Sequence, residues 1–312
     1  MKCFYNLDSV DISSYTAVTI GMFDGLHLGH LKVIDGCIAV AKEKGLKSCL
    51  ITFSNHPADF FTKKRNELLM PMAEKISALE KYGIDYLLIL PFDTYLVEIP
   101  AVDFVAQILV KKLMAKSVVL GYDNHFGKNR EGSTSFIQSH FSPELEAISI
   151  EVAKVDDVIV SSSQIKKYLS EGEVTSAKSM LGRHYKISGK VIHGNQNGRK
   201  IGFPTANMSL DADNKFIPQL GVYLCQVEVV SGIYYGLTNM GYRPTLNKDE
   251  GIHIETHILD FDGDIYGQPI SIQFVEKIRS EKRFDSFDEL KNQIAADLAW
   301  AKLYLAQIHV AS

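Results

Sequence analysis

The stretch TAVTIGMFDGLHLGH (residues 16–30) joins a short apolar run to a turn that is rich in glycine and histidine. The run at 16–20 is β-branched and apolar, so it predicts a buried strand. Gly21 then permits backbone conformations that are closed to other residues and lets a ligand approach the main chain. His27 and His30 are three positions apart, so on the first turn of a helix they share one face. A helix N-terminus offers unpaired N–H groups and a positive dipole end, which together suit phosphate.

Two other interpretations stay open for the histidine pair taken alone. Both residues can be ordinary turn residues, which is the commoner case for an isolated H-x-x-H pattern. Zinc is a weaker alternative, because two histidines without a further ligand set do not complete a site. The preceding strand and the glycines at 21, 25 and 29 favour phosphate, with the imidazoles donating hydrogen bonds to charge that builds up at phosphorus.

The first part of the chain alternates strand-like and helix-like segments. The expected strands are 16–20, 46–53, 85–90 and 117–121, and the expected helices are 72–83 and 101–115. This rhythm predicts an α/β domain with a Rossmann-like, doubly wound parallel sheet and helices on both faces. Ligands of such sheets bind beyond the carboxyl ends of the strands, which is where the glycine–histidine turn lies.

The pattern changes near Gly182, after an amphipathic segment at 163–181. Strand-like segments at 221–230, 233–241 and 253–267, with turns at 231–232 and 262–263, predict a small antiparallel β-barrel. A terminal helix follows: Ser286 and Glu289 form an S-x-x-E capping box, and one face carries Leu290, Ile294, Leu298 and Leu305. We therefore expect two domains, 1–182 and 183–312.

Composition excludes several classes of protein. With 33 basic and 37 acidic residues the formal net charge is −4, so the chain lacks the basic surface of a nucleic-acid-binding protein. The four cysteines are scattered, which argues against a zinc site and a disulfide framework. No apolar run reaches the roughly 20 residues of a membrane span. We expect a soluble cytoplasmic protein without a nucleic-acid or membrane partner, and no protein partner is inferred.

The opening motif resembles a known signature. Read as G-x-F-D-G-x-H-x-G-H, the residues from Gly21 to His30 are similar to the nucleotidyltransferase superfamily, and more narrowly to the adenylyltransferase module of prokaryotic bifunctional riboflavin kinase/FAD synthetase. Three later stretches resemble further motifs of that module: TFSNHP (52–57), GYDNHFGKNREG (121–132) and SSSQIKKYLSEG (161–172). The chain differs from the family pattern at Asn55, Asn124, His125, Ser163 and Lys166.

The second half resembles the riboflavin kinase module of the same family. GKVIHGNQNGRKIGFPTANM (189–208), NMGYRPT (239–245), HIETHILDFDGDIYG (253–267) and IRSEKRF (278–284) follow in family order. The resemblance implies a kinase that moves the γ-phosphate of ATP to riboflavin, giving FMN, and an adenylyltransferase that joins FMN to AMP from a second ATP, giving FAD and pyrophosphate. Mg²⁺ is the implied cofactor, and riboflavin, FMN and ATP are the implied partners.

The resemblance also implies a role for each matching residue. The implied catalytic residues are Glu255, His27, His30 and Lys166. The implied ATP-binding residues are Gly21, Phe23, Asp24, Gly25, Ser161, Ser162, Ser163, Gly194, Gly198, Arg199, Gly202, Thr205 and Asn207, of which Thr205 and Asn207 would also contact the metal. The implied flavin-binding residues are His56, Asp123, Phe126, Arg243, Arg279 and Phe284, although a surface salt bridge is an alternative for Arg279.

The proposed kinase residues also have a physical basis. Thr205 and Asn207 supply hard oxygens two positions apart, which suit Mg²⁺. Glu255 alternates with Ile254 and so faces away from a core residue, where a carboxylate can act as general base toward a hydroxyl. The alternative interpretations without a catalytic role are that PTAN (204–207) is an ordinary turn and that Glu255 lies on a solvent-exposed face of its strand. Two functional alternatives also remain: a kinase-only enzyme with a degenerate N-terminal nucleotide-binding module, and a non-catalytic flavin-binding regulator.

Overall fold

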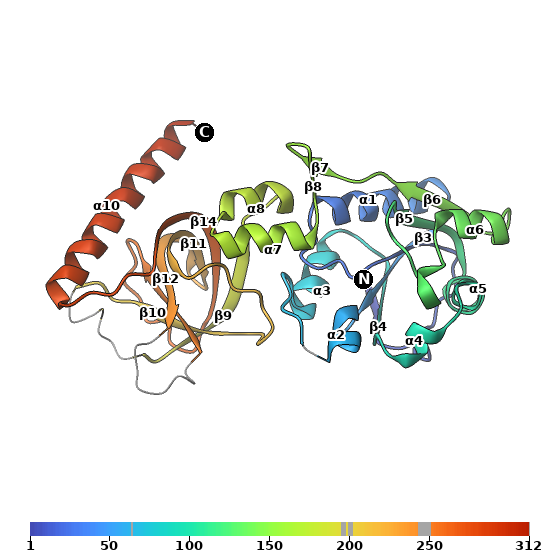
Figure 1. Cartoon of the computed structure of the whole chain (residues 1–312), viewed down its shortest axis with the longest axis horizontal. Coiled ribbons are helices and arrows are strands. Elements are labelled where there is room, and N and C mark those ends of the chain that lie inside the picture. The colour runs from blue at the N-terminus through green and yellow to red at the C-terminus, as the bar shows by residue number, and fades with distance from the viewer. Residues whose placement is uncertain (64, 195–197, 199–201, 243–250, 312) are drawn as a thin grey trace. The chain divides into compact units, whose positions relative to one another are not determined.

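The computed structural model describes residues 1–63, 65–194, 198, 202–242 and 251–311 (Figure 1). The chain divides into two compact units, Met1–Ser162 and Ser163–Ser312. No helix among these described residues is both long and apolar enough to cross a membrane.

The first unit is built on a parallel sheet whose strands run in the order β1-β4-β3-β2-β5-β6. Their bounds are Lys2–Phe4 for β1, Thr16–Ile20 for β2, Lys47–Phe53 for β3, Tyr86–Leu90 for β4, Ala115–Gly121 for β5 and Glu146–Ile150 for β6. All five residues of β2 are buried, which is typical of a parallel strand covered on both faces. The expected parallel sheet is therefore confirmed.

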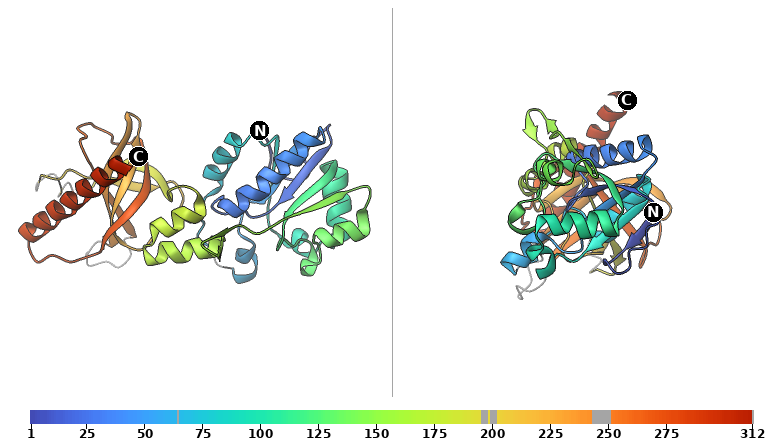
Figure 2. Two further views of the ribbon diagram at one scale, coloured as in Figure 1. Left: turned by 90° about the horizontal axis from the view of Figure 1, so that it is seen from above. Right: turned by 90° about the vertical axis from the view of Figure 1, so that its right-hand side faces the viewer.

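Helices cover both faces of this sheet. Helix α1 (Leu28–Glu43) runs along one face of the sheet (Figure 2). It packs there through Val33, Cys37 and Ala41, and α3 (Met72–Lys81) covers the same face. The opposite face packs against α4 (Thr94–Glu98), η1 (Phe104–Lys112) and α6 (Thr134–Phe141). Because side chains alternate between the two faces along each strand, every strand contributes to an apolar core on each face. With helices packed on both of these cores, the sheet is doubly wound.

Two expected boundaries in this unit were wrong. The helix expected at 101–115 consists of α5 (Ala101–Asp103) and the π-helix η1, which ends at Lys112, and β5 begins at Ala115 rather than at 117. Met114 adopts φ 52°, a left-handed conformation that breaks the helix before the strand. The remaining helical elements here are α2 (Pro57–Thr62) and η2 (Lys128–Arg130), and a small hairpin pairs β7 (Lys154–Val155) with β8 (Val158–Ile159).

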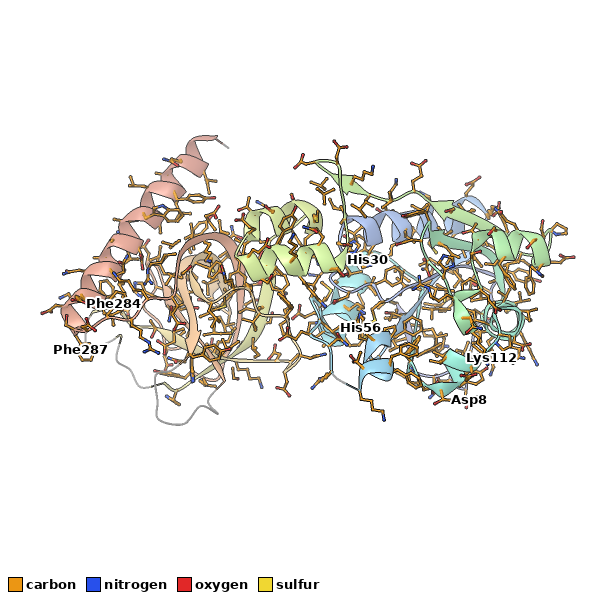
Figure 3. All side chains as sticks on the ribbon, in the orientation of Figure 1. Asp8, His30, His56, Lys112, Phe284 and Phe287 are labelled. Atoms are coloured by element: carbon orange, nitrogen blue, oxygen red, sulfur yellow. The ribbon has the colours of Figure 1, made fainter. Side chains whose placement is uncertain are left out.

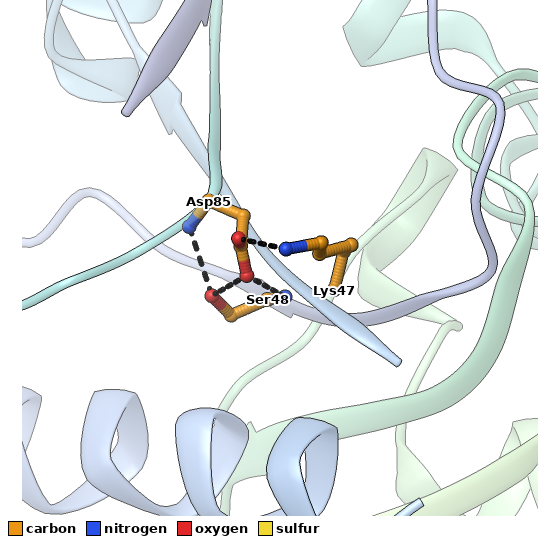
Figure 4. Close-up of polar contacts among 3 residues, drawn as sticks. All are labelled: Lys47, Ser48 and Asp85. Atoms are coloured by element: carbon orange, nitrogen blue, oxygen red, sulfur yellow. Dashed lines mark hydrogen bonds and ion pairs between the residues drawn. The ribbon is translucent and has the colours of Figure 1, made fainter. Parts of the chain in front are cut away.

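A polar cluster joins the amino end of β3 to the residue just before β4 (Figure 4). Lys47 Nζ lies 2.8 Å from Asp85 Oδ1, and Ser48 donates from its N and its Oγ to Asp85 Oδ2, each at 3.0 Å. The N–H of Asp85 donates in return to Ser48 Oγ at 2.9 Å. Burial acts to raise the pKa of the Asp85 carboxyl, but these hydrogen bonds outweigh it and hold the pKa below its ordinary value.

The second unit contains a closed antiparallel barrel in the order β10-β13-β12-β11-β14-β9. The strands are β9 (Lys186–Ile192), β10 (Ala206–Leu210), β11 (Gly221–Val229), β12 (Gly232–Tyr242), β13 (Ile252–Ile258) and β14 (Pro269–Ser280). Val191, Met208, Ile254 and Met240 are neighbours across four strands and are all buried inside. The expected barrel is confirmed, and helices α7 (Ser162–Glu171) and α8 (Val174–Leu181) precede it.

The strand expected at 253–267 ends early. Strand β13 stops at Ile258, a turn follows at residues 259–260, and the second turn lies at 266–267 instead of 262–263. Asp260 has φ 53° and Gly267 has φ 74°, backbone conformations that interrupt an extended strand. The acidic segment between them has no strand partner among the described residues, so the alternation of polar and apolar residues there misled the prediction.

The terminal helix α10 (Phe287–Ala311) begins as expected, because the N–H of Glu289 donates to Ser286 Oγ at 3.2 Å. Leu298 and Leu305 pack against the outside of the barrel, around Leu224, Leu237 and Val275. The Asp297 carboxylate, of which 4% is exposed, accepts from Arg279 Nε at 3.0 Å. This partly buried ion pair attaches the helix to β14.

Candidate active sites

The turn after β2 has an unusual backbone. Phe23 and Leu26 adopt left-handed φ values of 50° and 42°, and Gly25 has φ 85°. A non-glycine residue in this region costs of order 1–3 kcal/mol, and it persists only when the surroundings enforce it. A Cβ at Gly25 would lie 2.9 Å from Leu69 Cδ1, so position 25 needs glycine for space as well as for φ. Such enforced strain is typical of ligand-binding turns.

The turn delivers His27 and His30 to the start of α1, where both were expected. His27 is the N-cap of the helix, and the N–H of His30 donates to His27 Nδ1 at 3.3 Å. Because Nδ1 accepts this bond, a neutral His27 carries its proton on Nε2. The two rings stack with centroids 3.5 Å apart, and a Cβ at position 29 would lie 3.2 Å from the His27 ring. Gly29 therefore makes room for the stack.

Phe23 and Asp24 are buried residues of the turn that carries the stacked histidines. The Phe23 ring is buried, and it meets the His30 ring edge-on with centroids 5.3 Å apart. A Cβ at position 21 would lie 3.1 Å from the Phe23 ring, so Gly21 leaves room for this ring. Asp24 is only 2% exposed, and its Oδ1 accepts from the N–H of Met70 at 3.0 Å. Both residues have internal partners, and a contact of either with ATP stays a prediction.

Two distant segments meet the turn. Ser162 Oγ donates to the carbonyl of Asp24 at 2.9 Å, although 138 positions separate them. Asn124 Nδ2 donates to the carbonyl of Ile20 at the end of β2. Asn124 and Ser162, each from one of the later motifs, thus reach the carboxyl edge of the sheet where the opening motif lies. Ser161 and Ser163 flank Ser162 in sequence, and their contacts with ATP stay predictions.

A third predicted histidine follows the carboxyl end of β3. His56 is the N-cap of α2 and accepts from the N–H of Ala58 at 3.1 Å (Figure 3). Its neighbour Asn55 bonds the backbone of Phe92 in both directions: Nδ2 donates to the carbonyl at 3.0 Å, and the N–H donates to Oδ1 at 2.8 Å. Asn55 thereby ties the ends of β3 and β4 together, a role that proline could not fill because it has no side-chain amide.

The third motif gives different environments to its two predicted flavin residues. Asp123 is exposed in the loop after β5. Phe126 is buried in the core, with its ring 5.2 Å from the ring of Phe104, and a Cβ at Gly132 would collide with it. The described contacts of Phe126 are those of a packing residue, and a contact with flavin stays a prediction.

Lys166 lies one turn after the start of α7, and its Nζ is 6.0 Å from the centre of the Phe216 ring in the second unit. This contact was not expected from the sequence. Its predicted catalytic role is not tested by the geometry within that unit.

Lys75 contacts the histidine turn and was missed by sequence reasoning, and Thr52, although part of the stretch 52–57, was given no role of its own. Lys75 is 1% exposed, and its Nζ donates to the carbonyl of Met22 at 2.6 Å and to Thr52 Oγ1 at 3.3 Å. The available signal was its position four residues before the buried Leu79, on the apolar face of α3, where a lysine is out of place.

In the barrel, the predicted base and a predicted metal ligand are neighbours. Asn207 on β10 pairs with Glu255 on β13, and Glu255 pairs in turn with Asn239 on β12. Directly opposed residues of antiparallel strands share one face, with Cβ atoms about 5 Å apart. Asn207 is 8% exposed, whereas Glu255 is half-buried, so the carboxylate is the more accessible of the two.

The glycine segment lies close to the same residues. A Cβ at Gly194 would lie 2.4 Å from Asn207 Nδ2, and a Cβ at Gly198 would lie 3.2 Å from Thr205 Oγ1. The N–H of Phe203 donates to the carbonyl of Gly198 at 2.8 Å. Glycine is required at both positions because any side chain would enter the space of the predicted metal ligands.

The remaining predicted residues are placed only in part. Gly202 has φ 88°, whereas Arg199 and Arg243 lie outside the described residues. The Arg279 guanidinium lies 5.7 Å from the centre of the ring of Phe284, which is labelled in Figure 3. Arg279 also forms an ion pair with Asp297. The salt bridge considered for Arg279 is therefore present, and flavin contacts of Arg279 and Phe284 stay predictions.

Clusters of His, Cys, Asp or Glu side chains are the other common kind of metal site. Across the described part of the chain, no three His, Cys, Asp or Glu side chains gather as a possible metal site. Thr205 and Asn207 supply neutral oxygens instead, which fit a hard cation that takes its other ligands from phosphate and water.

Comparison with known proteins covers both units. A family model described as FAD synthetase matches residues 10–167, and one described as riboflavin kinase matches residues 181–305. Bifunctional riboflavin kinase/FMN adenylyltransferase of Pseudomonas fluorescens is 35% identical over 92% of each chain, and that of Haemophilus influenzae is 38% identical over 92% of this chain and 94% of its own.

A solved structure agrees over the same length. A Streptococcus pneumoniae protein described as a macrolide-efflux protein superimposes with a TM-score of 0.89, at 29% identity, covering 96% of this chain and 98% of that one. Two family models in order, near-complete coverage and identities above 30% are decisive. The chain belongs to the family of bifunctional riboflavin kinase/FMN adenylyltransferases.

Proposed function

We propose that this chain makes FAD from riboflavin in two steps, each at its own site. The barrel transfers the γ-phosphate of ATP to the ribityl 5′-hydroxyl of riboflavin, giving FMN and ADP. The first unit then transfers AMP from a second ATP to FMN, giving FAD and pyrophosphate. The observation that carries the proposal is the pairing of Asn207 with Glu255 in a chain whose two halves both match the family in order.

In the kinase step, Glu255 would accept the proton of the 5′-hydroxyl while that oxygen attacks the γ-phosphorus. Phosphoryl transfer depends mainly on alignment and charge neutralisation, so an accessible carboxylate beside the phosphate-binding strand suits it. Gly194 and Gly198 let the backbone come close to the ATP phosphates, and we place Arg199 and Gly202 with them. We place Arg279, Arg243 and Phe284 on the flavin side of this site.

Mg²⁺ is the cofactor that the kinase site would hold, through Thr205 Oγ1 and Asn207 Oδ1. When bound there, it would offset the negative charge of the ATP phosphates. The oxygen donors fit a hard cation, and the glycines at 194 and 198 leave the space that phosphate needs. Asn207 is buried, which limits the space in which its amide can move before a ligand arrives.

In the adenylyl step, a phosphate oxygen of FMN attacks the α-phosphorus of ATP and pyrophosphate leaves. The stacked His27 and His30 imidazoles would donate hydrogen bonds to the charge that develops on the α-phosphate. The Nε2 proton of His27 supports this role, because Nδ1 is already used within the helix cap. Gly21, Gly25 and the Ser161–Ser163 segment would surround the phosphates, with Lys166 adding positive charge.

We place FMN in this step beside the ATP, at the same carboxyl edge of the sheet. His56 follows β3 and Asp123 follows β5, and these two strands lie on either side of β2, which leads into the histidine turn. Phe126 is buried three residues after Asp123. We also place the domain boundary at residue 182 and the protein in the cytoplasm.

The two half-reactions test the proposal separately. Purified protein with ATP, Mg²⁺ and riboflavin should yield FMN and then FAD on reversed-phase chromatography. Supplying FMN, ATP and Mg²⁺ without riboflavin should yield FAD and pyrophosphate. FMN that accumulates without FAD at any ATP concentration would reduce the protein to a kinase.

The base assignment has its own test. Glu255→Gln should lower the rate of FMN formation by at least about 100-fold, the usual range for a lost general base. Riboflavin binding, measured by quenching of its fluorescence, should persist. Glu228→Gln on β11 is the matched control, because that side chain is exposed. Undiminished FMN formation by Glu255→Gln would refute the assignment.

A further inference from the structure

Lys75 is a lysine inside the core of the first unit. Its side chain is 1% exposed and comes from α3, which packs on one face of the sheet. Lysine is almost never fully buried unless its ammonium has partners. The partners here are the carbonyl of Met22 at 2.6 Å and Thr52 Oγ1 at 3.3 Å.

Burial of this ammonium is unfavourable for folding. It lowers the pKa of Lys75 from 10.5 to about 8, even though the nearby Asp24 carboxylate favours the charged form. A methionine has nearly the same length and would fill the same space without a charge to desolvate. Stability of the core alone therefore does not account for a lysine at this position.

The ammonium acts on the turn that carries the histidines. The Met22 carbonyl accepts from Lys75 Nζ and also from Thr52 Oγ1, the latter at 3.1 Å. Met22 immediately precedes Phe23, where the chain enters its left-handed conformation, and the turn ends at His27. A carbonyl held by two side-chain donors fixes the peptide plane from which the rest of the turn is built.

We propose that Lys75 is a positioning residue for adenylyl transfer: its ammonium anchors the Met22 carbonyl and thereby holds the turn that presents His27 and His30 to the nucleotide phosphates. This inference rests on the proposed adenylyl step. It assigns Lys75 no contact with substrate. Loss of the ammonium leaves Thr52 as the single described side-chain donor to that carbonyl, and the strained turn then has fewer contacts to enforce it.

The test compares Lys75→Met with Lys81→Met, an exposed lysine on the same helix. FAD formation from FMN and FMN formation from riboflavin are measured on the same preparations. Lys75→Met should lower kcat for FAD formation at least tenfold, since small misplacements of catalytic groups are costly, with KM for FMN within about threefold. FMN formation should be unchanged in both variants, and Lys81→Met should retain both activities. Full kcat for FAD formation in Lys75→Met would overturn the inference.

Thr52→Val separates positioning from a general loss of folding. It removes the second donor to the same carbonyl, so it should lower kcat for FAD formation to a smaller extent and leave FMN formation intact. Two residues that share an acceptor are energetically coupled, so the double variant should lose less than the product of the two effects. Multiplicative effects would argue that the two side chains act independently and would overturn the shared anchoring.

A readout that does not depend on turnover keeps the two proposals apart. If the unmodified protein forms no FAD, the adenylyl function fails at that point. The imidazole NMR signals of His27 and His30, assigned with single-residue variants, should still shift in Lys75→Met and stay in place in Lys81→Met. Unshifted signals in a folded Lys75→Met protein would overturn the positioning role, whatever the activity of the unmodified protein.

Discussion

Gly194→Ala is the substitution whose effect on the kinase site can be worked out most directly. The new Cβ would lie 2.4 Å from Asn207 Nδ2, 2.5 Å from Cγ and 2.7 Å from Oδ1. Ordinary contacts begin near 3.4 Å, so the amide must move by about 1 Å. Asn207 is 8% exposed and sits in a strand paired on both sides, so the backbone cannot give way easily.

The expected result is a fall in kcat for FMN formation of about 100-fold, or about 2.7 kcal/mol, because a displacement of this size in a metal-binding group disrupts alignment. Position 194 has no left-handed φ, so the added methyl acts through the contact with Asn207 rather than through backbone strain. Chromatographic assay of both half-reactions should show FAD formation from FMN unchanged.

Gly251→Ala is the matched control in the same unit. A Cβ at position 251 meets no described atom within 4 Å, and this glycine also lacks a left-handed φ. It should retain both activities. Trp300, the single tryptophan of the chain, reports unfolding of the barrel unit through its emission. A Gly194→Ala protein that keeps kcat within twofold would refute the proposed role of Asn207.

Charged side chains give three further expected outcomes. Asp85→Asn should destabilise the first unit at neutral pH, because the lowered pKa of this carboxyl stabilises the fold above its unfolded pKa. The destabilisation should shrink as pH falls below the unfolded pKa and through the lower folded pKa. Urea unfolding followed by circular dichroism over a series of pH values from neutral downward measures it. Asp297→Ala leaves the Arg279 guanidinium without its carboxylate and should destabilise the barrel unit by about 3 kcal/mol, as read from Trp300 emission in urea. Lys75 has a pKa of about 8 in the folded protein and 10.5 ordinarily, so between these values the unfolded chain binds more protons than the folded one. The free energy of unfolding, relative to that of Lys75→Met, should therefore rise by about 2 kcal/mol between about pH 7 and pH 9.5. The same urea titration measures this difference.

Each of these outcomes has a contrary result. An Asp85→Asn effect that does not shrink as pH is lowered would show that the carboxyl stabilises β3 and β4 through shape rather than charge. Lys302→Ala, at an exposed lysine on α10, is the control for Asp297→Ala. Equal losses of stability in the two variants would show that the Arg279–Asp297 ion pair does not account for the effect. A pH-independent difference between the unmodified protein and Lys75→Met would mean that the ammonium stays charged in the core.

Much of the fold could be predicted from local pattern. The β-branched run at 16–20 and the apolar periodicity of 72–83 report burial within one turn or one strand, and the structure confirms both elements. The strand expected at 253–267 failed because its alternation continues past Ile258, where no neighbouring strand is available among the described residues. A strand ends where pairing ends, and pairing depends on residues far away in sequence.

The candidate sites divide in the same way. The sequence by itself determined which chemical groups are present: two histidines at the start of a helix, and threonine, asparagine and glutamate on short strands. Only the tertiary structure decided that Asn207 lies beside Glu255, that Asp24 bonds to Met70, and that the Lys75 ammonium lies under the histidine turn. Local periodicity records whether a residue faces the core, but a hydrogen bond between segments 46 or 53 positions apart depends on register and packing, which no local window contains.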